Sequence, residues 1–384
     1  MPPRTLSRPG GFFHRADEMA ALRIGVNALY LIPGGVGGTE IYLRGLMAAL
    51  AEIDSSNEYF VFTNRETGPD LVPKQANFHW RPQPVRASFR PARIAWEQTG
   101  LPMAARGLDA LLNPGFTSPI YCACPMVTVI HDLQHRRYPE FFRWFDLPFW
   151  RMLLFASVHV SRFVLAVSET TRADLLRFYR LPEAKIRMAP LGVDPEMFGL
   201  ARRPEPFLLC VSTLHPHKNL DGLLPAFARV RQARPEFRLV IAGLRGFAAD
   251  ALEQLRTTLG LEGAVDFTGW LPREAVRDLY ARASGFVFPT LFEGFGLPIL
   301  EALAAGVPAA CSRIEPLTSL AGAAVLQFDP RDTEAMAAAM LRLVLDEELR
   351  TRLAEAGPRQ AARYSWVATA RTTLDALQEA ARTR

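Results

Sequence analysis

The fold of this chain is decided by Phe288-Pro289-Thr290-Leu291-Phe292-Glu293-Gly294-Phe295-Gly296-Leu297-Pro298-Ile299-Leu300-Glu301-Ala302-Leu303-Ala304-Ala305-Gly306-Val307-Pro308. An apolar run at residues 285–288 leads into this stretch and predicts a buried strand. Gly294 and Gly296 cannot continue that strand comfortably, whereas Pro298 favours the first turn of a helix that Gly306 closes. The stretch therefore predicts a strand, a glycine loop and a helix in succession.

The glycine loop has the chemistry of an anion site. Backbone N–H groups at a helix N-terminus favour phosphate, because the helix dipole places partial positive charge there. Glu293 on the loop and Glu301 one turn into the helix stand in the order Glu-x7-Glu, and carboxylates accept hydrogen bonds from hydroxyl groups. A site that offers backbone amides to phosphate groups and carboxylates to hydroxyl groups suits a nucleotide sugar. The alternative is a purely structural turn, since glycine-rich turns are common in α/β proteins.

Length and composition indicate a globular protein of two domains. The chain has 384 residues, of which 49% are hydrophobic and 22% charged. The net charge of +5 permits anionic partners such as nucleotides or a membrane surface without requiring either. No clustered basic face or known module indicates a nucleic-acid partner.

Cysteine usage and the terminal segment indicate the compartment. Four cysteines are too few and too scattered for a disulfide framework or a four-ligand zinc site, so a reducing cytoplasm is the expected setting. No apolar run reaches the length of a membrane span, and the first twenty residues have no signal-peptide core. We expect residues 1–20 to be a disordered leader.

The first half of the chain predicts an α/β domain over residues 21–200. Residues 23–31 read as a buried strand, and a second glycine loop with Gly34, Gly35, Gly37 and Gly38 follows it and opens a helix at residues 41–51. The spacing is not the G-x-G-x-x-G of dinucleotide-binding folds, so a nicotinamide cofactor is not indicated. The glycines still indicate that a ligand or another backbone approaches closely.

Further strands are expected at residues 59–63, 78–80, 110–112, 126–130 and 163–167. Their alternation with helices predicts a parallel sheet, whose ligands bind beyond the carboxyl ends of the strands. His131 and Asp132 follow one such strand and are therefore candidate site residues. The alternative for His131 is a structural histidine with satisfied hydrogen bonds.

The second half repeats this pattern after a polar, proline-bearing linker at residues 201–206. Strands are expected at residues 207–211, 238–243, 265–268, 285–288, 309–312 and 324–328, which predicts a second doubly wound domain over residues 201–365. Helical periodicity returns at residues 332–356 and 367–380, and we expect residues 366–384 to dock back on the first domain. Lys218 is expected at the mouth of the second sheet, where an ammonium group can contact a diphosphate. The alternative is a surface lysine without a role in binding.

An aromatic segment at residues 141–155 carries five phenylalanine and two tryptophan side chains, interleaved with Arg143 and Arg151. It suits an interfacial helix that touches lipid and places the protein peripherally at the inner face of a membrane. Pro148 interrupts the segment, and the alternative is that the aromatic side chains belong to the core.

Several short motifs together resemble the retaining glycosyltransferases of family 4, which have the GT-B fold. The motifs are Gly34-Gly35, Trp96-Glu97-Gln98, His131-Asp132, Val167-Ser168-Glu169, Pro190-Leu191-Gly192-Val193-Asp194, Pro216-His217-Lys218-Asn219 and Glu293-Gly294-Phe295-Gly296-Leu297-Pro298 with Glu301. Each is weak alone, but their order over residues 22–380 is hard to obtain by chance.

The resemblance implies two Rossmann-like domains of doubly wound parallel sheets that face a cleft. It assigns catalysis to His131, Glu293 and Lys218, and the acceptor side to Gly37, Gly38 and Asp132. It places the donor nucleotide sugar against Gly35, Ser212, Lys218, Glu293, Gly294, Phe295, Gly296, Leu297 and Glu301. The implied reaction moves a hexose, mannose or a deoxyhexose, from a donor such as GDP-mannose to a saccharide or lipid-linked acceptor in polysaccharide assembly.

The resemblance implies no metal or other cofactor, which agrees with the absence of an Asp-x-Asp motif that would hold a divalent ion on a diphosphate. One departure from the family concerns Ser212, which stands six residues before Lys218, where many relatives carry an arginine. Arg245 is a candidate replacement. The rival interpretations are a GT-B enzyme with another class of donor and a catalytically silent subunit of a glycan-assembly complex.

Overall fold

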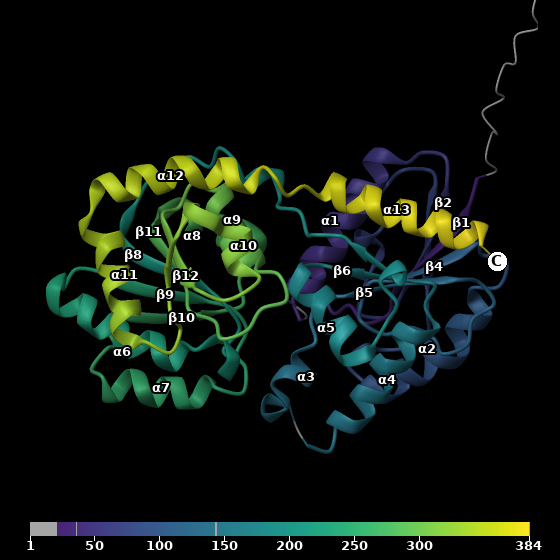
Figure 1. The fold of residues 1–384 in the computed structure, drawn as a ribbon, viewed down its shortest axis with the longest axis horizontal. Helices are drawn as coiled ribbons and strands as arrows, with labels where there is room; N and C mark the ends of the chain where they lie inside the picture. Colours follow the sequence, from purple (N-terminus) through teal and green to yellow (C-terminus); the bar gives the residue numbers. More distant parts are fainter. Residues whose placement is uncertain (1–20, 36, 143, 384) are drawn as a thin grey trace, which may run out of the picture.

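The computed structural model describes residues 21–35, 37–142 and 144–383, so the leader expected at residues 1–20 lies outside the described residues. The chain forms two lobes that lie side by side, each built on a parallel sheet with helices on its faces (Figure 1). Among the described residues, no helix has both the length and the apolar character to cross a bilayer.

Within the described residues, the first lobe holds seven parallel strands in the order β3-β2-β1-β4-β5-β6-β7. These strands form because short runs of apolar residues are buried on both faces of the sheet; all five residues of β5 are buried. The bounds are β1 Arg23–Ala28, β2 Glu58–Thr63, β3 Phe78–Pro82, β4 Ala110–Asn113, β5 Met126–Ile130, β6 Phe163–Ala166 and β7 Ile186–Met188.

The described part of the second lobe holds six parallel strands in the order β10-β9-β8-β11-β12-β13. The bounds are β8 Glu205–Val211, β9 Arg238–Ala242, β10 Val265–Gly269, β11 Ala283–Phe288, β12 Ala309–Ser312 and β13 Leu326–Phe328. Numbered from its own first strand, this sheet has the order 3-2-1-4-5-6 that the first lobe shows before β7 is added. In both sheets the order in which the strands are added reverses between two neighbouring strands, at β1/β4 and at β8/β11. Such switch points are where α/β proteins bind ligands.

The helices of the first lobe are α1 Gly38–Ile53, α2 Arg90–Ala104, α3 Gln134–Arg137, α4 Leu147–Val160 and α5 Glu169–Tyr179. Those that follow are α6 Leu220–Ala233, α7 Ala249–Thr258, α8 Arg273–Arg282, α9 Leu297–Ala304, α10 Leu317–Ala321, α11 Thr333–Leu345, α12 Glu347–Ala361 and α13 Trp366–Arg382. Three-residue 3-10 helices lie at η2 Pro139–Phe141, η4 Pro195–Met197 and η5 Pro216–Lys218.

The chain crosses between the lobes twice, and the two crossings are joined. Val193 in the first crossing forms a β-bridge with Ser365 in the second, and Thr369 Oγ1 donates to the Pro190 carbonyl at 2.5 Å. Beyond the second crossing, α13 packs on α1 and runs over the first lobe (Figure 1). The last helix of the chain is thus part of the first lobe, although the sequence reaches it only after the second lobe is complete.

Three local expectations differ from the structure. The helical run expected at residues 332–356 is two helices, α11 and α12, because Asp346 ends the first and caps the second with its side chain. Strand β7 had no signal strong enough to predict it, since it is three residues long. Pro148 does not interrupt the aromatic segment but lies in the first turn of α4, where proline is well tolerated.

Candidate active site

A cavity of about 1430 Å³ separates the two lobes at the carboxyl ends of both sheets. Every residue that the sequence assigned to the site lines this cavity: Gly35, Gly37, Gly38, His131, Asp132, Ser212, Lys218, Glu293, Gly294, Phe295, Gly296, Leu297 and Glu301. These residues come from loops after β1, β5, β8 and β11, and from the start of α9. The topology therefore brings together side chains that are up to 266 residues apart in the numbered sequence (Gly35 to Glu301).

The loop between β11 and α9 has the predicted form of strand, glycine loop and helix. Gly296 is the N-cap of α9 at φ 108°, a conformation that favours glycine, and Pro298 lies in the first turn. A Cβ at Gly296 would also approach the Leu317 side chain to 2.5 Å. The backbone amides of this loop thus begin a helix that opens on the cavity.

Lys218 and Glu293 form an ion pair within the cavity, in which Lys218 Nζ donates to Glu293 Oε1. The two side chains are only 15% and 12% exposed, and the ammonium lies 5.6 Å from the centre of the Phe288 ring. Their loops are fastened together, because the Leu291 N–H donates to the His217 carbonyl at 2.8 Å. The pair therefore has a fixed place at the end of the second sheet.

His131 lies opposite this pair, directly after β5. Its Nε2 is 2.9 Å from the Pro114 carbonyl, which can only accept, so Nε2 carries the hydrogen. Burial lowers the pKa of His131 to about 4, and the hydrogen bond to Pro114 opposes this shift only in part. The imidazole is therefore neutral at pH 7.

Asp132 adds a second carboxyl group near Glu293. The Gln134 N–H donates to Asp132 Oδ1 at 2.9 Å. Burial raises the pKa of Asp132 to about 6, and the negative charge of Glu293 adds to this rise. The sequence placed Asp132 on the acceptor side, but it could not show that this carboxyl group interacts with Glu293 across the cavity.

The two lobes approach each other closely at Gly294. A Cβ at this position would lie 2.0 Å from the His131 carbonyl oxygen and 2.9 Å from Asp132 Cβ. Only a residue without a side chain allows this approach. A second approach lies at the glycine loop after β1, where a Cβ on Gly34 would be 2.9 Å from the Trp270 ring of the other lobe.

Glu301 is buried and already has hydrogen-bond donors. Arg273 Nη1 donates to its Oε1 at 2.6 Å, and the Tyr280 hydroxyl donates to its Oε2 at 3.0 Å. Arg273 also reaches Asp194 of the first crossing at 3.5 Å. Sequence reasoning missed Arg273, because it lies 28 residues from Glu301 and no local pattern marks it.

The surroundings of Ser212 and Arg245 bear on the missing arginine. Ser212 is buried, and its hydroxyl donates to the Thr213 carbonyl at 3.0 Å. Arg245 lines the cavity but is held by Asp250 at 2.9 Å and Glu253 at 3.6 Å. Arg245 must leave these two acids before it can contact a diphosphate, so its role as a replacement stays a prediction.

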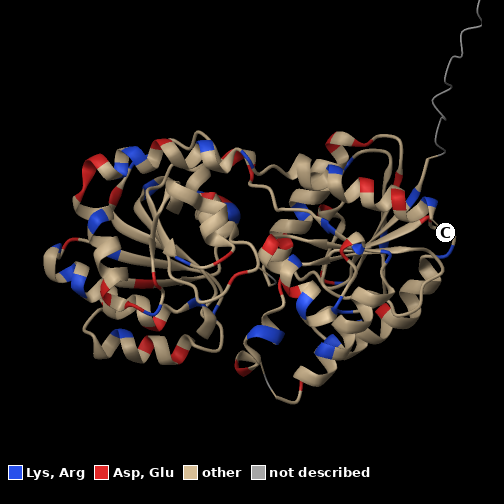
Figure 2. Cartoon of the chain, in the orientation of Figure 1, with Lys and Arg blue, Asp and Glu red and all other residues tan. Residues whose placement is uncertain are grey.

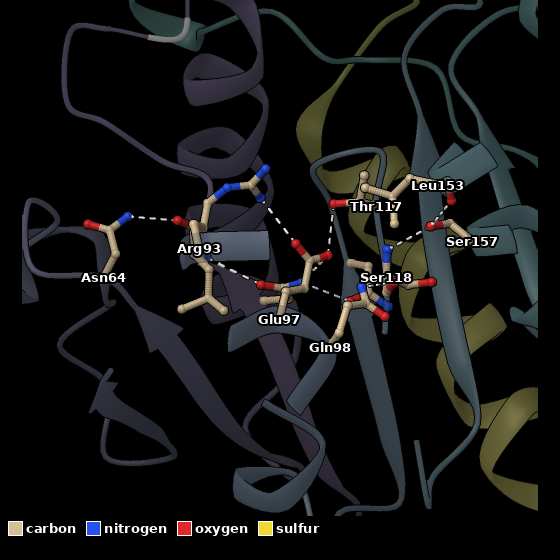
Figure 3. A network of polar contacts seen from close by, with 11 residues as sticks. Asn64, Arg93, Glu97, Gln98, Thr117, Ser118, Leu153 and Ser157 are labelled. Atoms are coloured by element: carbon tan, nitrogen blue, oxygen red, sulfur yellow. Dashed lines mark hydrogen bonds and ion pairs between the residues drawn. The ribbon is translucent and has the colours of Figure 1, made fainter. Parts of the chain in front are cut away.

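Glu97 and Gln98 of the Trp96-Glu97-Gln98 motif belong to a network of polar contacts (Figure 3). Glu97 is fully buried; it accepts hydrogen bonds from Thr117 Oγ1 at 2.8 Å and Arg93 Nη1 at 3.1 Å. Burial raises the pKa of Glu97, and the charge of Arg93 opposes this rise. This network joins α2 to the loop after β4, which carries Phe116 into the cavity.

In residues 21–35, 37–142 and 144–383, no group of three or more His, Cys, Asp and Glu side chains is arranged to hold a metal ion.

Two doubly wound parallel sheets that face one cavity form the two-lobed arrangement of the GT-B fold. Sucrose-phosphate synthase from Thermosynechococcus elongatus has this fold, with a TM-score of 0.76 and 21% identity over 93% of this chain and 98% of that one. The family model of Glycosyltransferase Family 4 matches residues 36–197, and that of Glycosyl transferases group 1 matches residues 196–360. The chain belongs to the family 4 glycosyltransferases.

Two curated relatives are mannosyltransferases by name. O-antigen chain mannosyltransferase B from Escherichia coli is 31% identical over 265 residues, which are 65% of this chain and 69% of that protein. MMP alpha-(1->4)-mannosyltransferase from Mycolicibacterium hassiacum is 26% identical over 90% of this chain and 95% of that protein. Membership of this family implies a nucleotide-sugar donor and a saccharide acceptor.

Proposed function

We propose that this glycosyltransferase moves a mannosyl residue from a nucleoside-diphosphate sugar to a saccharide or lipid-linked acceptor, with retention of configuration and without a metal. Mannose is favoured over a deoxyhexose because mannosyltransferases stand among the relatives reported above. The observation that carries the proposal is the Lys218–Glu293 pair, which faces His131 and Asp132 across the cavity.

Each element of the cavity fits one part of such a donor. Lys218 and the amides at the start of α9 suit the diphosphate, because both present positive charge to it. Glu301 suits the ribose hydroxyls, since its two oxygens can each accept a further hydrogen bond beside those from Arg273 and Tyr280. Glu293 then lies between the diphosphate and the first lobe, where the transferred sugar would lie.

In the proposed reaction, the bond between the sugar C1 and the leaving phosphate oxygen breaks while the acceptor oxygen bonds to C1 on the same face. The acceptor proton passes to the leaving phosphate oxygen, and Lys218 stabilises the charge that develops on the diphosphate. A double displacement would need a free carboxylate nucleophile. The ion pair speaks against Glu293 in that role, because Lys218 already holds its carboxylate.

Donor and acceptor can be identified with the purified protein. A panel of nucleotide sugars is ranked by the increase in melting temperature, since a ligand that binds the folded state alone stabilises it. Release of nucleoside diphosphate is then measured with the selected donor and a saccharide acceptor, with and without EDTA, and the anomeric configuration of the product is read by NMR. A β-configured product from an α-configured donor, or loss of turnover in EDTA, would contradict the proposal.

Three outcomes would favour other interpretations. If inorganic phosphate replaces the nucleotide as co-substrate, the enzyme belongs to another donor class. If Lys218→Met and Glu293→Gln bind the donor and leave turnover unchanged, the residues carry no catalytic role. If no donor in the panel is consumed although one of them binds, the chain is a binding subunit.

A further inference from the structure

Helix α4 carries apolar side chains on both of its faces. Its inner face is buried and includes Leu153, Leu154 and Val158. Surface helices normally present polar residues outward, but along α4, which the structure describes throughout, the exposed side chains are apolar apart from His159. The large exposed ones are Phe149 at 47%, Met152 at 57%, Phe155 at 50% and Val160 at 39%, preceded by Trp144 at 83% and Phe145 at 57%.

The inner face of α4 is fixed to the first lobe, so the helix cannot roll inward to bury its outer face. The Ser118 N–H donates to Ser157 Oγ at 3.0 Å, and Ser157 Oγ donates to the Leu153 carbonyl at 2.8 Å (Figure 3). Gln98 on α2 holds the same loop through the Ser118 carbonyl at 3.1 Å. That loop continues into Tyr121, which is 83% exposed and lengthens the apolar surface.

The charge around this surface is positive. The sequence of α4 contains Arg151 and no acidic residue, and its ribbon shows a blue segment and no red one (Figure 2). Arg90 lies 4.6 Å over the Trp150 ring. Near the C-terminal end of the helix, Lys185 Nζ donates a hydrogen bond of 2.5 Å to the His159 carbonyl. Asp146 precedes the helix. An apolar strip bordered by cations fits an anionic lipid surface, whereas two copies of it face to face would bring like charges together.

Helix α4 is connected to the cavity through packed aromatic side chains. Trp150 packs 6.4 Å from Phe116, which lines the cavity and lies 5.1 Å from His131. The segment before α4 also touches the second lobe, because Tyr138 lies 5.5 Å from Phe292, the neighbour of Glu293. Trp150 of α4 is therefore separated from the cavity by the single side chain of Phe116.

We propose that the outer face of α4, formed by Phe145, Phe149, Met152, Phe155 and Val160, docks on an anionic lipid bilayer and presents the cavity to an acceptor anchored in that bilayer. The docking itself is independent of the chemistry in the cavity. Its use in catalysis rests on the proposed transfer to a lipid-linked acceptor.

The test uses the purified full chain, vesicles of phosphatidylcholine with or without phosphatidylglycerol, and the variant Phe149→Ser/Phe155→Ser. We expect the wild type to float with the phosphatidylglycerol vesicles, with binding that weakens as salt is raised. The double variant should bind at least about tenfold more weakly, because two phenylalanine side chains no longer leave water. Leu345→Ser is the matched control, since Leu345 is 56% exposed on α11 of the other lobe.

Three outcomes would overturn the docking. They are a wild type that floats with neither vesicle, a double variant that floats like the wild type, and a wild-type dimer in sedimentation velocity that the double variant converts to a monomer. The last outcome would mean that a second copy covers the face.

Activity separates the docking from the proposed function. With a water-soluble saccharide acceptor, the double variant should turn over like the wild type, because Phe149 and Phe155 do not line the cavity. With a lipid-linked acceptor in phosphatidylglycerol vesicles, its kcat/KM should fall about tenfold, in step with its weaker binding. An equal kcat/KM on vesicles would refute the use of docking in catalysis. A wild type that transfers to neither acceptor would refute the proposed function and leave the vesicle result standing.

Discussion

Gly294→Ala should reduce turnover strongly while leaving the fold intact. The new Cβ would lie 2.0 Å from the His131 carbonyl oxygen, and ordinary contact begins near 3.4 Å, so the two backbones must separate by roughly 1.4 Å. Both partners are backbone, which cannot rotate away as a flexible side chain can. Because they belong to different lobes, the cheapest relief is a wider opening between the lobes. A displacement of about 1 Å in a reacting geometry can cost about 100-fold in rate, so we expect kcat to fall by roughly that factor.

The measurement is nucleotide release at saturating donor and acceptor, together with the melting temperature of the protein without ligand. The melting temperature should change by less than about 2 °C, since the clash lies between the lobes and not within a core. Gly263→Ala is the control: it is in the same lobe, and a Cβ there meets no atom within 4 Å. Turnover of Gly294→Ala within twofold of the wild type would refute the reasoning, as would a melting temperature lowered by 8 °C or more.

Three further variants test the site. Lys218→Met should lower kcat by about 100-fold or more, because the diphosphate loses its cation. It should also destabilise the fold by about 3 kcal/mol, because Glu293 is left buried without its partner. In urea unfolding, Lys218→Met/Glu293→Gln should regain the stability, but it should not regain the activity. Asp132→Asn should be the more stable protein at pH 7.5 and lose that advantage at pH 4. The pKa of Asp132 is raised to about 6 in the folded wild type and is about 4 in the unfolded chain, so the wild type loses stability as pH rises from about 4 to about 6. Unfolding curves that give the two proteins equal stability at every pH would exclude this. By calorimetry, the wild type should bind nucleoside diphosphate about tenfold or more tightly than its 2′,3′-dideoxy form. In Arg273→Gln the two affinities should lie within about threefold of each other, because Glu301 has lost the arginine that orients it. A variant that discriminates as strongly as the wild type would refute this role.

The local parts of the site could be predicted from the sequence. Gly296 and Pro298 fix where β11 ends and α9 begins, because each restricts backbone conformation through its own covalent structure. The apolar runs fix the strands, and their alternation with helices fixes the parallel sheets. Strands of parallel sheets place their carboxyl ends at one edge, so Lys218 and His131 could be assigned to the mouths of their sheets before any contact was known.

Contacts between loops that are distant in the sequence could not be predicted in the same way. Lys218 and Glu293 are 75 residues apart, and their pairing depends on how two loops of one sheet meet. The approach of Gly294 to His131 depends in addition on the angle between two separately folded lobes. The raised pKa of Asp132 follows from that approach, because it arises from burial and from a charge on the other lobe.

For the exposed face of α4, too, the sequence predicts the helix but not its surroundings. Its aromatic spacing in the sequence fits a core helix and a lipid-facing helix equally well, because periodicity records which residues share a face and not what covers that face. The sequence by itself determined every strand except β7, the glycine loops and the residues at the sheet edges, which follow from local covalent restrictions and periodicity, and the order of its motifs indicated the family. Only the tertiary structure decided which of these residues touch, that Arg273 holds Glu301, and that Phe149 and Phe155 point outward, because burial and pairing are properties of the packed whole.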